Sequence, residues 1–136
     1  MFTLHPRLEQ DTFLIKKLEI SQLRLMDDSR YSWVMLVPER PDITDLHHLS
    51  GTDYTAVMQE IREVSKMMED LFSPFKLNIG ALGNLVPQLH IHIIARNQED
   101  DAWPGPVWGV GEARPYAEAK KNILLEKFSN YPLNKI

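Results

Sequence analysis

"PQLHIHIIAR", residues 87–96, alternates polar and apolar residues through most of its length. A period of two is typical of a β-strand that buries one face. The polar positions are Gln88, His90 and His92, and side chains at i and i+2 of a strand lie on one face, about 6.5–7 Å apart along the chain. We therefore expect a strand over residues 88–95 that turns both histidines toward a cleft or solvent and its apolar residues toward a helical layer.

The rest of the sequence supplies the other elements of one sheet and its covering helices. Runs rich in β-branched, aromatic and aliphatic residues predict strands, and apolar stripes at three- and four-residue spacing predict helices. The strands are expected at 11–20, 21–28, 31–38 and 76–81, and the helices at 51–72 and 116–130. Strands joined by short turns pair antiparallel most readily, so the fold class is α+β, with helices packed against the sheet.

Two of these elements carry clear boundary signals. The run 31–38 is apolar on both faces and is closed by a proline, which predicts a central strand. The stretch 51–72 has a continuous apolar stripe. Ser50 or Thr52 can cap the start of this helix, and Pro74 ends it.

Composition restricts the class of protein. The chain has 136 residues, 43% hydrophobic and 25% charged, which fits one soluble globular domain. It has no cysteine, so disulfides and thiolate metal sites are excluded. The net charge of −4 argues against a nucleic-acid binder, and no apolar run approaches the ~18 residues of a membrane span. The beginning of the sequence does not read as a secretory signal, so we expect a cytoplasmic protein without a membrane partner.

Elementary chemistry leaves three uses for a pair of histidines on one strand face. His90 and His92 can be a solvated pair on an open sheet face. They can share a metal ion, for which His47 or His48 would have to provide a third ligand. They can also carry out nucleophilic catalysis, in which one imidazole attacks while its neighbour orients it or serves the leaving group.

The segment Gln88–Ile94 resembles the signature of the histidine-triad (HIT) family, His-φ-His-φ-His-φ-φ with φ apolar, with glutamine in place of the first histidine. The likeness extends over residues ~14–96, including "LRLMDDSRYSWVMLVPERPDITDLHHL" (23–49) and "NIGALGN" (78–84). "DDAWPGPVWG" in the tail is similar to a bacterial branch of small HIT proteins. The resemblance implies one HIT-like domain over 1–136, with about five antiparallel strands, one long helix, a C-terminal tail (97–136) that contains a helix, and a homodimer.

The same resemblance implies an activity. Members of the family hydrolyse or transfer nucleotidyl groups: the middle histidine attacks the α-phosphate of a nucleoside phosphoramidate or dinucleoside polyphosphate, forming a covalent nucleotidyl-histidine intermediate. His90 takes that place, and His92 would contact the α-phosphate or leaving group. Gln88 is the third catalytic position; it cannot act as an acid or base but can hydrogen-bond in either sense. No cofactor is required, and with a polyphosphate substrate a divalent metal ion could take part.

The resemblance also points to residues that would bind the nucleotide. Asp27 would bind the ribose hydroxyls, and Asn84 would be a polar contact on the phosphate side. Asn78 would lie near the site, Leu25 would line the base pocket, and Trp108 would shape specificity. Asp27 can equally be a surface turn carboxylate, and Asn84 can be plain turn chemistry.

Two other functions stay open at this point. A non-catalytic nucleotide-binding or regulatory module could have kept the pocket and lost turnover through the replacement at Gln88. A metal-binding protein could use His90 and His92. Apart from that alternative, we assign no metal site.

Overall fold

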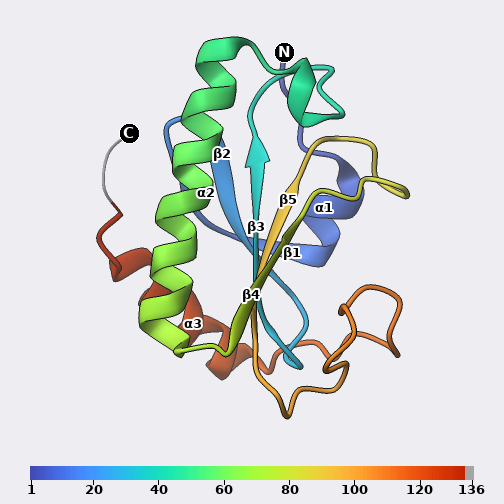
Figure 1. Cartoon of the computed structure of the whole chain (residues 1–136), viewed down its shortest axis with the longest axis vertical. Helices are drawn as coiled ribbons and strands as arrows, with labels where there is room; N and C mark the ends of the chain where they lie inside the picture. The colour runs from blue at the N-terminus through green and yellow to red at the C-terminus, as the bar shows by residue number, and fades with distance from the viewer. Residues whose placement is uncertain (134–136) are drawn as a thin grey trace.

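The structure, a computed structural model, describes residues 1–133 and contains an open five-stranded antiparallel sheet (Figure 1). The strands are β1 (Thr12–Lys17), β2 (Ser21–Met26), β3 (Ser32–Pro38), β4 (Lys76–Gly80) and β5 (Ile91–Arg96), in the order β1-β2-β3-β5-β4. The helices are α1 (Pro6–Asp11), α2 (Gly51–Phe72) and α3 (Glu118–Asn130), with a 3₁₀ turn η1 (Leu46–His48). The predicted α+β class is confirmed. Residues 134–136 of the predicted tail lie outside the described residues.

β3 is the middle strand of the sheet, as its apolar sequence predicts. It pairs antiparallel with β2 on one side and with β5 on the other. Val34 and Leu36 are fully buried on one face, and Trp33 and Met35 are almost fully buried on the other. β3 therefore contributes to the packing on both faces of the sheet.

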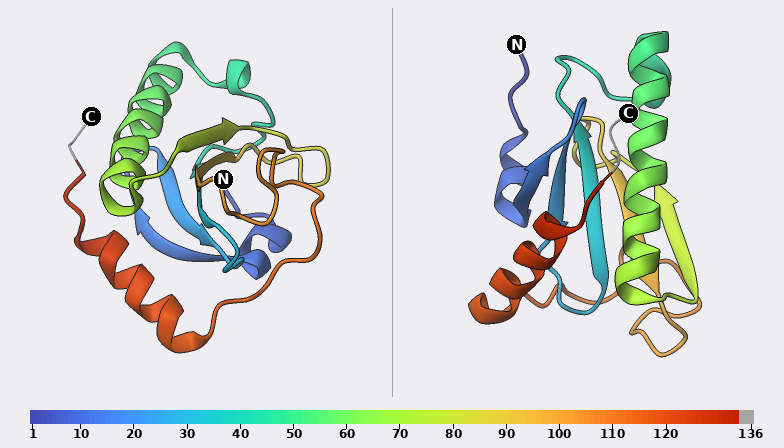
Figure 2. Two further views of the ribbon diagram at one scale, coloured as in Figure 1. Left: turned by 60° about the horizontal axis from the view of Figure 1, so that its bottom comes forward. Right: turned by 90° about the vertical axis from the view of Figure 1, so that its left-hand side faces the viewer.

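One face of the sheet forms the main hydrophobic core. α2 and α3 both lie on this side, as the left view of Figure 2 shows. Fully buried residues from strands and helices meet there: Leu23, Val34, Ile93, Val57, Val64 and Met68. Leu89, Ile91 and Ile93 face this layer as the alternation predicts.

The opposite face is covered by irregular segments and a short helix. Leu8 of α1 and Val86 of the β4–β5 connection pack on Met35. Val107, from the segment that follows β5, packs near Trp33. Because loops rather than a continuous helix cover this face, it has room for a cavity.

The predicted strand 88–95 begins later than expected, at Ile91. Gln88 and Leu89 bond to other parts of the chain instead of extending the ladder: the N–H of Leu89 donates to the carbonyl of Ile43 at 3.0 Å. α1 was not predicted. It has six residues, begins with Pro6 and is capped by the side chain of His5.

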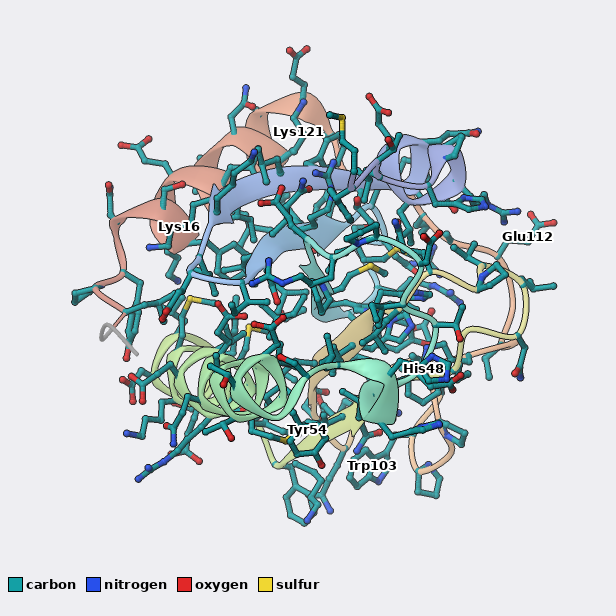
Figure 3. The ribbon with its side chains drawn as sticks, turned by 90° about the horizontal axis from the view of Figure 1, so that it is seen from above. Lys16, His48, Tyr54, Trp103, Glu112 and Lys121 are labelled. Atoms are coloured by element: carbon teal, nitrogen blue, oxygen red, sulfur yellow. The ribbon has the colours of Figure 1, made fainter. Side chains whose placement is uncertain are left out.

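The two long helices each have a side-chain hydrogen bond at one end. Ser50 caps α2, since its hydroxyl accepts from the N–H of Asp53. Lys16 of β1 reaches the end of α3, where it donates to the carbonyl of Tyr131 at 3.1 Å; Figure 3 shows Lys16 beside that helix. Among residues 1–133, none of the helices is long and apolar enough to cross a bilayer.

Candidate active site

A cavity of about 480 Å³ opens on the loop-covered face of the sheet. Its walls come from α1, β2, β3, the β4–β5 connection, the start of β5 and the segment after β5. Most of its lining is apolar: Leu8, Met26, Trp33, Met35, Val86 and Val107. The polar groups in it are few, which is typical of a site for a small organic ligand.

The two histidines of the motif lie side by side in this cavity. The ring centroids of His90 and His92 are 4.9 Å apart, edge to face. Trp33 and Trp108 contact His92 on other sides, with centroids at 5.6 and 5.3 Å. Only 7% of His90 and 5% of His92 is exposed, so the pair is not a solvated surface feature.

The hydrogen bond of His90 fixes which ring nitrogen carries the proton. Nδ1 of His90 lies 2.7 Å from the backbone carbonyl oxygen of Gln88. A carbonyl oxygen only accepts, so Nδ1 is the donor in this contact. In the neutral ring Nε2 then carries a lone pair, and it has no hydrogen-bond partner within residues 1–133.

His92 has the opposite arrangement. The indole N–H of Trp33 donates to Nδ1 of His92 at 3.0 Å, which places the ring proton on Nε2. Burial, and secondarily the repulsion between the two imidazoles when both are protonated, lowers the pKa of His92 to about 3. His92 is therefore neutral at physiological pH and offers an N–H donor at Nε2.

The cavity also contains four charged side chains, which form two ion pairs. Arg7 and Asp11 pair within α1 at 2.7 Å, and their side chains are partly exposed. Arg30 and Asp28 form a buried pair at 2.9 Å. Burial acts to raise the pKa of Asp28, but hydrogen bonds from Arg30 and the Arg114 amide outweigh burial, so the pKa is lowered. Both pairs are neutral overall.

Arg30 also fixes the segment after β5 over the cavity. Its guanidinium donates to the carbonyl of Val110 at 2.6 Å. Trp108 of that segment packs against Gly80 of β4, where an added Cβ would lie 3.3 Å from the indole. The absence of a side chain at Gly80 thus allows Trp108 to approach His92.

Four of the residues predicted for the site line the cavity. His90 and His92 lie next to each other, Trp108 contacts His92, and Asn84 lies in the connection that leads to the motif. Asn84 is exposed, so it is open to a ligand from the solvent side.

The other four predicted residues do not line the cavity. The side chain of Gln88 bonds to the backbone of the N-terminal segment, and Asp27 accepts from the N–H of Tyr116 at 2.8 Å. Leu25 is fully buried in the core beneath α2. Asn78 accepts from Arg96 at 2.7 Å, in a buried network.

Several lining residues were missed by the sequence analysis. Met26 occupies the place expected for Leu25, because alternate residues of β2 point to opposite faces. Trp33 and Met35 could have been found by the same alternation in β3, since they share the face of His92. Nothing in the sequence signals that Arg7 lines a cavity.

The structure also bears on the metal alternative. His47 and His90 both line a smaller cavity of about 230 Å³ next to η1. Figure 3 shows His48 on that turn. Within residues 1–133, however, no group of three or more histidine, aspartate or glutamate side chains is placed to hold a metal ion.

Comparisons with known proteins add the family context. The model of the HIT domain matches residues 7–99. Solved histidine triad proteins from Bradyrhizobium japonicum, Sinorhizobium meliloti and Marinobacter aquaeolei are 41%, 42% and 40% identical, with TM-scores of 0.91, 0.92 and 0.92. The matches cover 93%, 94% and 93% of this chain, and 95%, 95% and 93% of those chains.

A curated relative matches a shorter stretch. The asymmetrical bis(5′-nucleosyl)-tetraphosphatase of Schizosaccharomyces pombe is 32% identical over a match 72 positions long, which covers 49% of this chain. The match covers 39% of that enzyme, so this chain spans about two fifths of its length.

Proposed function

The chain belongs to the HIT domain family, and from that premise we propose that it is a nucleotide hydrolase or transferase that works through a covalent nucleotidyl-His90 intermediate. In this proposal the cavity holds a nucleotide, with its base against the apolar wall and its α-phosphate at the two histidines. The similarity to a dinucleoside tetraphosphatase supports nucleotide chemistry at the level of the family.

The observation that carries the proposal is the pair of opposite tautomers. His90 has its lone pair on Nε2, as a nucleophile needs, because Nδ1 donates to the carbonyl of Gln88. His92 has its proton on Nε2, as a donor to phosphate oxygen needs, because Nδ1 accepts from Trp33. A solvated pair of histidines would have no reason to be held in this way.

The reaction follows from these two groups. Nε2 of His90 forms a bond to the α-phosphorus, and the bond between phosphorus and the leaving group breaks with its electron pair on the leaving group. The leaving group takes up a proton from solvent, so the amine of a phosphoramidate departs uncharged. His92 donates a hydrogen bond to the phosphate, where negative charge is concentrated. Water then attacks phosphorus, the bond to His90 breaks, and a nucleoside monophosphate and neutral His90 are released after loss of the water proton.

Of the two substrate classes, the charges of the cavity favour the phosphoramidate. Its lining contains two cations and two anions, and each cation is already paired: Arg7 with Asp11 and Arg30 with Asp28. A phosphoramidate brings little charge and needs no further cation. A dinucleoside polyphosphate brings several charges and would depend on a divalent metal ion for neutralisation.

Trapping of the intermediate tests the proposal. Brief incubation with adenosine 5′-phosphoramidate labelled at phosphorus should leave an acid-labile, base-stable adenylyl group on His90. We expect His90→Ala to lose the label and to slow turnover by roughly three to six orders of magnitude. His48→Ala, on the exposed turn η1, is the matched control and should keep both the label on His90 and the wild-type turnover. Unchanged turnover in His90→Ala would exclude this residue as the nucleophile.

The non-catalytic alternative gives a different result in the same experiment. A binding module would show a melting temperature raised by AMP without release of product. A metal-binding protein would retain stoichiometric zinc after dialysis and lose it in His90→Ala. The zinc result is not expected here, because the tautomers leave one lone pair and one donor rather than two ligands.

We also propose a cytoplasmic homodimer, as the family resemblance implies. The edge strand β4 supports the dimer, since Ile79 and the neighbouring Phe75 leave 49% and 64% of their surfaces exposed. Light scattering on the protein as it elutes from a size-exclusion column should give twice the mass of the chain. A monomeric mass at micromolar concentration would contradict the dimer.

A further inference from the structure

One side chain of the motif holds the segment that precedes α1. Oε1 of Gln88 accepts from the backbone N–H of His5 at 2.8 Å, and Nε2 donates to the carbonyl of Thr3 at 2.8 Å. The two backbone groups flank Leu4. The side-chain amide therefore pairs with this segment as the N–H and C=O of one residue in an adjacent parallel strand would.

The chemistry of this contact explains why the position holds glutamine. A primary amide presents an acceptor and a donor side by side on an uncharged group. The two nitrogens of an imidazole point away from each other, so a histidine could not bond to both sides of Leu4. A glutamate would keep the acceptor and lose the donor.

The segment held in this way leads directly into a wall of the cavity. Arg7, Leu8 and Asp11 of α1 line the cavity that contains both histidines. Phe2 and Leu4 pack against the same small cluster as Leu8, beside Met35. The position of α1 over the cavity thus depends on contacts made by residues 2–5.

Gln88 also contacts the reacting group through its backbone, because its carbonyl accepts from Nδ1 of His90. We propose that Gln88 is a positioning residue for substrate binding, whose side-chain amide holds residues 3–5, and with them α1, as a wall of the nucleotide cavity. This inference rests on the proposed function for the identity of the ligand. It assigns no proton transfer to Gln88.

The test replaces the amide with an apolar chain of similar length. In Gln88→Met, we expect hydrogen exchange at the amide of His5 to become faster by about tenfold or more, because both bonds are lost. KM for adenosine 5′-phosphoramidate should rise several-fold, with kcat changed by less than about twofold, as for loss of binding alone. Gln98→Met, at an exposed position after β5, should change neither quantity.

A second variant covers the case in which Gln88→Met does not fold. Gln88→His introduces an imidazole and should accelerate exchange at His5 and raise KM in the same way. Unchanged exchange at His5 in either variant would overturn the inference, as would a lower kcat with unchanged KM.

Failure of the proposed function would be recognised separately. If the wild-type protein releases no product, Kd for AMP takes the place of KM. Faster exchange at His5 with weaker AMP binding would still support the positioning role. Unaltered exchange and AMP affinity would overturn it.

Discussion

Trp33 determines which nitrogen of His92 carries the proton. Its indole N–H is a donor that cannot become an acceptor, so Nδ1 of His92 is held without a proton. A buried indole that lost this partner would forfeit about 1–3 kcal/mol, which disfavours the other tautomer. In the proposed reaction this residue would therefore act through His92.

Trp33→Phe removes the donor and keeps an aromatic ring at this position. We expect nitrogen chemical shifts in NMR spectra to show that His92 loses its single Nε2–H tautomer, and kcat to fall by about tenfold or more. Trp103→Phe removes an indole that does not line the cavity, and it should leave the tautomer of His92 and kcat unchanged. An unaltered tautomer in Trp33→Phe would contradict the assignment.

The lowered pKa of His92 makes stability depend on pH. The pKa is about 3 in the folded protein and 6.5 in the reference state. Between these values the unfolded chain binds a proton that the folded protein does not, so stability falls as pH falls through this window. The loss is at most a few kcal/mol, at about 1.4 kcal/mol per unit of pKa.

His92→Asn removes this titration and keeps an acceptor near the indole of Trp33. Its free energy of unfolding should therefore fall less between pH 7 and pH 4 than that of the wild type, as measured by urea denaturation at each pH. His48→Asn, at an exposed position, should keep the wild-type dependence. If the free energy of unfolding of His92→Asn fell with pH as steeply as that of the wild type, His92 would not be the source of the pH dependence.

At the scale of elements, a buried ion pair fastens the end of β5 to the segment after it. Arg96 and Asp100 are 1% and 3% exposed and lie 2.7 Å apart. Arg96 also donates to Asn78 of β4 and to the carbonyl of Gly105. The hydrogen bond from Arg96 is the main cause of the lowered pKa of Asp100. Asn78 therefore lies in a structural network, away from the cavity.

Asp100→Ala leaves the guanidinium of Arg96 buried without its partner. We expect a loss of about 3–5 kcal/mol in the free energy of unfolding, measured by denaturant titration. The adjacent Asp101→Ala breaks a pair with Arg114 that is largely exposed, and should change stability by less than about 0.5 kcal/mol. Equal losses of stability in the two variants would show that burial of the Arg96–Asp100 pair does not set the size of the effect.

Local patterns predicted the elements better than they predicted which side chains meet. The stripe, cap and proline of 51–72 are all local, and α2 has these bounds. The strand at 88–95 was placed too early, because Gln88 and Leu89 bond to distant backbone instead of the sheet. Alternation in β2 separates Leu25 from Met26, but only the position of α2 decides which of them reaches the cavity.

At the scale of the whole molecule, the cavity is electrically balanced although the chain carries a net charge of −4. Its two ion pairs differ in exposure: Arg30 and Asp28 are buried, whereas Arg7 and Asp11 keep 59% and 35% of their side chains exposed. The pair on α1 is therefore the one that substitution can alter without disrupting the fold.

Asp11→Asn leaves the charge of Arg7 without its carboxylate. We expect kcat/KM for diadenosine tetraphosphate to rise about two- to fivefold relative to adenosine 5′-phosphoramidate, and the gain to shrink with added salt. Asp101→Asn changes the net charge equally, outside the cavity, and serves as the control. A gain of the same size in the control would assign the effect to net charge.

The alternation of β3 has a consequence for how the gene would tolerate variation. Val34 and Leu36 face the core, while Trp33 and Met35 face the cavity. In a library that substitutes every codon and scores abundance and turnover separately, losses at positions 34 and 36 would register in both scores. Losses at 33 and 35, which also pack in buried clusters, would lower abundance as well but would lower turnover further, so the gap between the two scores would widen at every second codon along one strand.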